Sequence, residues 1–243
     1  MKDKVLFMTA CINPSGMPNT ALQSVSLRKK QYMEAINYYL ANTKYRILFV
    51  ENSGVDISSY FLEEIKTGRM EFLTFEGNDF DKKLGKGYGE GLIVRYALQN
   101  SKLLHADSMV IKVSGRHIVT NLSKIENLSN VFCGKNGYVV CDINPKTRGA
   151  NSDLFISSVD FLWLFEKNIE MINEESHIWF EHVLYKTIVQ YCNMNGKFIY
   201  LPLPLRQVGV SGSMGTSFKK PSLLLCIKHL IKFFFYEYKK GKI

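Results

Sequence analysis

The sequence predicts an α/β fold in which a mostly parallel β-sheet is flanked by helices and followed by a basic amphipathic helix at the C-terminus. Apolar runs over residues 5–12 and 47–50 have the length of buried strands, and residues 27–40 between them have helical character. A strand, a helix and a strand at this spacing are typical of a parallel βαβ unit. The 243 residues suffice for one large domain with an appendage.

The remaining elements continue this alternation. Further strands are expected over residues 71–75, 108–113, 137–142 and 198–203. Further helices are expected after the glycines of 85–91 and over 155–169 and 176–192, because apolar residues recur there on one side. The absence of an internal repeat or a long linker predicts one domain over residues 1–218 and a tail over 219–243.

Composition excludes several classes of protein. Hydrophobic residues at 46% and charged residues at 22% are ordinary for a globular chain. No apolar run reaches the roughly 18 residues that cross a bilayer, and no small-residue cleavage site follows the first apolar run. The five cysteines include no C-x-x-C pair, which predicts reduced thiols in the cytoplasm rather than disulfides or structural zinc.

The apolar strand over residues 108–113 ends in a cluster of cations. It delivers Lys112, Arg116 and His117 to one small region beside a turn glycine. Because ligands bind at the carboxyl ends of strands in α/β proteins, this cluster predicts an anion site, with phosphate as the expected ligand. The alternative is an exposed turn whose charges are solvated.

Other polar segments follow strands or begin helices. Glycines 87 and 89 with Lys86 would let a phosphate approach a helix N-terminus, although a plain loop explains this spacing too. Asn52 and Ser53 could bind a base or ribose, or form a simple turn. Asp142 ends another strand, where capping a turn is the alternative role.

Two further segments offer chemistry. Glu175 and Glu181 surround the start of a helix, where partial burial would make Glu175 a general base; the alternative is a favourable charge at the helix start. Arg206 precedes the glycine- and serine-rich loop 209–215, which is either a lid over a ligand or a linker to the tail.

The tail carries most of the net charge of +9, because it holds seven lysines and one acid, Glu237. Its apolar residues fall on one helical stripe: Leu224, Ile227, Ile231, Phe234, Phe235 and Tyr238. Lys228 and Lys232 lie beside the stripe. This pattern predicts binding in the plane of an anionic membrane rather than to nucleic acid; packing on the protein's own core is the alternative.

Taken in order, these residues resemble a GT-A-type glycosyltransferase of bacterial surface-polysaccharide or lipopolysaccharide assembly. The match covers nearly the whole chain before the tail, and includes residues 51–54, Gly87 to Glu90, residues 112–116 and the Glu175 helix. The resemblance implies a GT-A-like (Rossmann-like) domain, a nucleotide-sugar donor, a glycan or lipid-linked acceptor, and a location at the inner face of the plasma membrane. The residues expected to bind the donor are Thr9, Asn13, Arg28, Asn52, Ser53, Lys86, Gly87, Gly89, Lys112, Arg116, Asp142, Arg206, Ser211 and Ser213.

The expected mechanism follows from the resemblance. Glu175, with Glu181 as the second candidate, would deprotonate the acceptor hydroxyl for direct, inverting displacement at the anomeric carbon. Lys112, Arg116 and Arg206 would stabilise the departing phosphate.

The chain departs from the common pattern of this family at the metal site. The D-x-D of Asp79 and Asp81 lies in a polar stretch rather than at a strand tip, and cations stand where the metal-binding acids are expected. His177 and His182 lack a third zinc ligand. The sequence therefore predicts a metal-independent site without a cofactor, with a divalent cation as the less favoured option.

Two other functions remain open. A sugar nucleotidyltransferase would share the sheet, but residues 9–16 lack the glycine-rich loop with Arg and Lys that such an enzyme carries. A non-catalytic membrane or nucleic-acid adaptor would explain the tail, but would leave the polar strand ends without a purpose.

Overall fold

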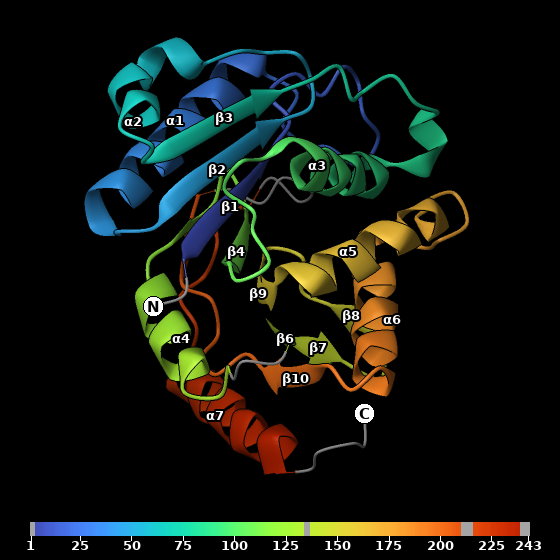
Figure 1. Cartoon of the computed structure of the whole chain (residues 1–243). Coiled ribbons are helices and arrows are strands. Elements are labelled where there is room, and N and C mark those ends of the chain that lie inside the picture. Colours follow the sequence, from blue (N-terminus) through green and yellow to red (C-terminus); the bar gives the residue numbers. More distant parts are fainter. Residues whose placement is uncertain (1–2, 134–136, 210–215, 239–243) are drawn as a thin grey trace.

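The computed structural model describes residues 3–133, 137–209 and 216–238, and it confirms the α/β fold. Seven strands form one sheet in the order β10-β6-β9-β4-β1-β2-β3 (Figure 1). They are β1 (Lys4–Ala10), β2 (Arg46–Glu51), β3 (Met70–Thr74), β4 (Met109–Ser114), β6 (Tyr138–Cys141), β9 (Leu154–Ser158) and β10 (Lys197–Tyr200). Only β9 runs antiparallel to its two neighbours in this sheet.

Helices cover both faces of the sheet because its strands are apolar on both sides. Along β1, Val5 and Phe7 face one core, whereas Leu6 and Met8 face the other. The first core is closed by α3 (Lys86–Asn100), α5 (Val159–Asn168) and α6 (Phe180–Asn193); the second is closed by α1 (Val25–Asn42), α2 (Leu62–Lys66) and α4 (Leu122–Asn130). This three-layer arrangement is what a buried parallel sheet requires.

Short elements complete the fold. Three 3₁₀ turns lie at η1 (Ser58–Tyr60), η2 (Lys82–Leu84) and η3 (Ile169–Met171). Two small antiparallel ladders join β5 (Ile118–Val119) to β11 (Gln207–Val208), and β7 (Ile143–Asn144) to β8 (Gly149–Ala150).

The tail forms the helix α7 (Leu223–Tyr238). Ser222 caps the start of this helix, because its hydroxyl accepts a hydrogen bond from the Leu225 N–H. One side of α7 packs on the domain: Phe233 is buried against Phe132, and His229 is buried beside Leu201. The opposite side leaves large apolar side chains exposed, namely Leu223, Leu224, Leu225, Ile227, Ile231, Phe234 and Phe235. The tail thus combines packing on the core with an exposed apolar stripe.

Two predicted helices need correction, and one helix is new. The helix expected over residues 155–169 is the strand β9 followed by α5, because Phe155 and Ile156 point into opposite cores. The helix expected over 176–192 begins only at Phe180, after a turn in which His177 has positive φ. The helix α4 was not predicted. Among the described residues, no helix is long and apolar enough to cross a membrane.

Candidate functional site

A cavity of about 430 Å³ lies at the carboxyl ends of β1 and β4. The chain leaves β1 for β2 on one side and reaches β4 on the other, so this is the topological switch point where α/β sheets bind ligands. The two strand ends approach closely, since the Gly115 N–H donates to the Thr9 carbonyl at 2.9 Å. A Cβ at residue 115 would lie 2.7 Å from that oxygen, so the close approach requires glycine.

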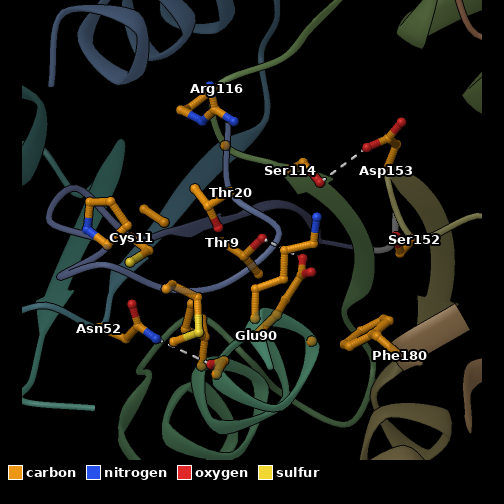
Figure 2. Close-up of a pocket in the computed structure, with 18 of the residues that line it drawn as sticks. Thr9, Cys11, Thr20, Asn52, Glu90, Ser114, Arg116, Ser152, Asp153 and Phe180 are labelled. Carbon is orange, nitrogen blue, oxygen red and sulfur yellow. Dashed lines mark hydrogen bonds between the residues drawn. The ribbon is translucent and has the colours of Figure 1, made fainter. Parts of the chain in front are cut away.

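Two arginines line one wall of this first cavity. Arg28 on α1 is only 6% exposed and is held by the carbonyls of Cys11 and Leu22. Arg116 follows β4 and donates to the Gln31 side chain at 2.8 Å; Figure 2 shows it above Thr9 and Ser114. Burial lowers the pKa of Arg116, yet a guanidinium remains charged at neutral pH. The wall is suited to an anion.

The structure corrects the role expected of Lys112. Its side chain is fully buried, forms an ion pair with Glu90 of α3 and donates to the Ser152 carbonyl. It is not among the lining residues of the cavity. Glu90 lines the cavity instead, and it accepts a hydrogen bond from the Thr9 hydroxyl at 2.9 Å (Figure 2).

The glycine-rich start of α3 is also used differently from the prediction. The carboxylate of Glu174 accepts a hydrogen bond from the Gly87 N–H at 2.9 Å. It lies so close to Gly85, whose φ is +83°, that a Cβ there would come within 2.1 Å of it. A side-chain carboxylate therefore takes the place at the helix N-terminus where a phosphate was expected.

The other residues predicted around the donor divide into two groups. Thr9, Asn52, Lys86, Gly87 and Gly89 line the first cavity. The Asn52 amide donates to the Gly89 carbonyl at 3.3 Å, and its buried Oδ1 has no hydrogen-bond partner among the residues that the structure describes.

The second group lies away from the first cavity. In the loops after β1 and β2, the Asn13 backbone N–H donates a hydrogen bond to the Ser53 hydroxyl, which donates one to the Glu51 carboxylate. The side chain of Arg206 is exposed and does not line the cavity. Asp142 directly follows β6, which β9 separates from β4, and it does not line the first cavity. Ser211 and Ser213 lie outside the described residues.

The sequence did not single out the pair of His117 and Asp153. His117 Nδ1 lies 3.4 Å from Asp153 Oδ1, and Gln207 donates to Asp153 Oδ2 at 3.1 Å. Burial alone would raise the pKa of Asp153, but hydrogen bonds from His117 and Gln207 with the nearby positive charges lower it to about 2. The His117 ring meets the edge of Phe218, which brings the C-terminal segment to the cavity.

The two candidate bases occupy different positions. Glu175 is 59% exposed, pairs with Lys83 at 3.2 Å and does not line the cavity, so the partial burial on which its role depended is absent. Glu181 lies in the first turn of α6, where it accepts a hydrogen bond from the Ser152 hydroxyl at 2.6 Å. Glu181 is the candidate that faces the cavity.

A second cavity of about 380 Å³ adjoins the first. Asn151, Trp179 and Glu181 line both cavities. The remaining lining residues are Asp142, Ile143, Asn144, Thr147, Gly149, Ala150 and His182. Glu181 therefore lies where a ligand in one cavity would meet a ligand in the other.

The carboxylates offer little to a divalent cation. Among the described residues, no group of three or more His, Cys, Asp or Glu side chains could hold a metal ion. Glu90 and Asp153 are already paired with Lys112 and His117. Asp79 is exposed, and Asp81 caps η2 through the Lys83 N–H at 3.0 Å. Neither Asp79 nor Asp81 lines the first cavity.

The fold and the site together define an α/β protein with a crevice at its switch point that Arg28 and Arg116 line. No family model and no protein of curated function matches the sequence. In three dimensions the chain is similar to a cytidylyltransferase from Leptospira borgpetersenii, with TM-score 0.46, 12% identity, and 82% of this chain and 76% of that one covered.

Two further solved structures show a comparable similarity. One is a protein assigned as a glucose-1-phosphate thymidylyltransferase from Bacillus anthracis, in complex with sucrose, with TM-score 0.45, 9% identity and 94% of each chain covered. The other is mouse xyloside xylosyltransferase 1, with TM-score 0.41, 12% identity, and 81% of this chain and 84% of that one covered.

Proposed function

We propose that the protein is a glycosyltransferase that moves a sugar from a nucleotide-sugar donor to a hydroxyl of a glycan or lipid-linked acceptor. One observation carries the proposal: the carboxylate of Glu181 stands where two cavities meet, and one of these cavities is lined by two arginines. A transferase needs this arrangement, because a base must reach the acceptor while cations stabilise the leaving group.

The donor phosphate is assigned to the wall formed by Arg28 and Arg116. Guanidinium groups bind phosphate oxygens through paired, charged hydrogen bonds. Lys86 lines the same cavity and donates to the Asn19 carbonyl at 3.2 Å. The unpaired Oδ1 of Asn52 supplies an acceptor for an N–H or hydroxyl of the nucleoside.

The proposed reaction is a direct displacement. Glu181 takes the proton of the acceptor hydroxyl, whose oxygen forms a bond to the anomeric carbon. The bond from that carbon to the phosphate oxygen breaks, and the departing phosphate keeps the electron pair beside Arg28 and Arg116. Attack from the face opposite to the leaving group inverts the anomeric centre. Because these arginines supply the positive charge, the proposal requires no divalent cation.

The proposed location of the protein is the inner surface of a bacterial plasma membrane. The proposed acceptors there are lipid-linked precursors of a surface polysaccharide or lipopolysaccharide. The exposed stripe of α7 supports this location, since large apolar side chains such as Ile231 and Phe234 lie on its outer side. The tail also carries seven lysines, which anionic lipids attract.

Nucleotide binding is the first test. The thermal unfolding midpoint of the full chain is measured with nucleoside mono- and diphosphates and nucleotide sugars, each with EDTA, Mg²⁺ or Mn²⁺. We expect stabilisation by at least one nucleotide sugar in EDTA. Stabilisation by no nucleotide contradicts the proposal, and strict dependence on Mn²⁺ contradicts its metal-free form. Release of pyrophosphate from a nucleoside triphosphate and a sugar phosphate identifies a nucleotidyltransferase instead.

A further inference from the structure

The second cavity differs in chemistry from the first. No lysine or arginine is among its lining residues, whereas two carboxylates, Asp142 and Glu181, are. Amide and hydroxyl groups come from Asn144, Asn151 and Thr147. Two carboxylates repel an anionic ligand and accept hydrogen bonds from hydroxyl groups. An uncharged polyhydroxyl ligand fits this lining, and a phosphate does not.

An aromatic ring forms part of the wall between the cavities. Trp179 is half-buried at the start of α6, where its backbone N–H donates to His182 Nδ1 at 3.3 Å. An indole offers a large, rigid apolar face that the C–H groups of a sugar ring can contact. An aromatic face beside several planar polar groups matches a pyranose, which has apolar faces and a rim of hydroxyls.

The tail helix is connected to the acidic end of this cavity. Asp142 accepts a hydrogen bond from the Tyr200 hydroxyl, and its other oxygen lies 3.8 Å from Nε2 of His229 on α7. Lys232, also on α7, donates to the Tyr200 hydroxyl at 2.8 Å. His229 is itself fixed, since its Nδ1 lies 3.2 Å from the Leu201 carbonyl, which can only accept. Lys232 of α7 thus orients Asp142 through the Tyr200 hydroxyl, whereas His229 packs beside it.

We infer that the second cavity binds the uncharged sugar of the acceptor, with Trp179 against its ring and Asp142 accepting from its hydroxyls, and that α7 positions Asp142 for this task. The inference rests on the proposed function and adds the class of ligand and the residues that select it. It also joins α7 to the acceptor site, because Lys232 of this helix contacts the Tyr200 hydroxyl that bonds Asp142.

Intrinsic fluorescence tests the cavity without any turnover. The chain has two tryptophans, so Trp163→Phe leaves Trp179 as the single reporter; Trp163 lies on α5 and lines neither cavity. The probes are methyl glycosides of neutral hexoses and of N-acetylhexosamines, with methyl glucuronide as the anionic counterpart. We expect saturable changes with at least one neutral glycoside, weaker binding of the glucuronide, and about tenfold weaker binding after Asp142→Asn.

Steady-state transfer to the glycoside that binds tests the role of α7. Lys232→Met and Asp142→Asn should both raise the acceptor KM. Neither should change the donor KM or the rate at which the donor is hydrolysed without acceptor. Lys167→Met on α5 removes the same charge at an exposed position and should leave both KM values unchanged. A fold defect would instead lower the rates of transfer and of donor hydrolysis together and leave both KM values unchanged.

Several outcomes overturn the inference while leaving the proposed function standing. They are nucleotide-sugar binding with no fluorescence response to any glycoside, tighter binding of the glucuronide than of neutral glycosides, and a rise in the donor KM rather than the acceptor KM after Asp142→Asn. Failure of all nucleotides in the thermal test contradicts the proposed function, whereas binding of a glycoside is measured separately, since the fluorescence titration needs no donor.

Discussion

The two adjoining cavities share a wall but are built from different parts of the chain. The first is formed by the ends of β1 and β4 and by the start of α3, and carries Arg28 and Arg116. The second is formed by the β7–β8 hairpin and the start of α6, and the described residues that line it include Asp142 and Glu181 but no lysine or arginine. The ends of long strands of the sheet thus frame the cavity that holds the two arginines, whereas short elements frame the second one.

Under the proposed function, this difference would let one domain hold two substrates of unlike charge next to each other. Arg28 and Arg116 line only the first cavity and would attract a phosphate there, although carboxylates such as Glu90 line that cavity as well. Glu181 stands at the border, so it is the residue whose change separates chemistry from binding most clearly.

The largest expected effect is that of Glu181→Gln. The amide keeps the shape and can still accept from the Ser152 hydroxyl, but it cannot take a proton from the acceptor. We expect kcat for sugar transfer to fall by about 10²–10⁴-fold, with donor affinity nearly unchanged. Rapid-quench or steady-state assays with saturating donor measure the change. Glu175→Gln is the matched control, and an equal loss in that variant would contradict the assignment.

Arg116→Ala tests the wall of the first cavity that Arg28 and Arg116 form. Removing a charged hydrogen bond to the donor phosphate should weaken donor binding by about 1.5–3 kcal/mol, which isothermal titration calorimetry with the nucleotide sugar can measure. Arg206→Ala removes the same charge from an exposed side chain and should change binding by less than about 0.5 kcal/mol. Equal losses in the two variants would mean that only the net charge matters.

Glu174→Ala tests the frame of the first cavity rather than its chemistry. The substitution leaves the buried N–H of Gly87 unpaired and removes a negative charge from the N-terminus of α3. We expect the free energy of unfolding in urea to fall by about 1–3 kcal/mol. The neighbouring Glu175→Ala should change it by no more than about 0.5 kcal/mol, and a similar loss there would remove the distinction between the two acids.

The pair of Asp153 and His117 predicts a smaller, pH-dependent effect. The pKa of Asp153 in the folded protein is about 2, below its ordinary value of 3.8. As the pH falls, Asp153 takes up a proton in the unfolded chain before it does so in the folded protein. The stabilisation is therefore present above about pH 4 and is lost as the pH falls towards 2. Urea midpoints across this range should fall less steeply for Asp153→Asn, and parallel curves would show that other groups dominate.

The sequence by itself was sufficient for the class of fold and for part of the first cavity. Apolar runs such as residues 47–50 have strand length and are apolar on both faces, as strands of a covered parallel sheet are. The polar residues after them lie at the carboxyl edge of the sheet. That reasoning brought Asn52 and Arg116 to one crevice, and the family resemblance added Thr9. The same reasoning missed β9, since its apolar residues run directly into those of α5 and periodicity alone does not separate the two elements.

Only the tertiary structure decided which charges are available to a ligand. Lys112 and Arg116 are four residues apart, yet Lys112 lies within β4, where it is buried and paired with Glu90, while Arg116 lies beyond the strand's end. Glu174 and Glu175 are neighbours, yet one caps α3 and the other is exposed. The physical reason is that a charge is neutralised by partners distant in sequence, and short-range patterns determine secondary structure but not those pairings.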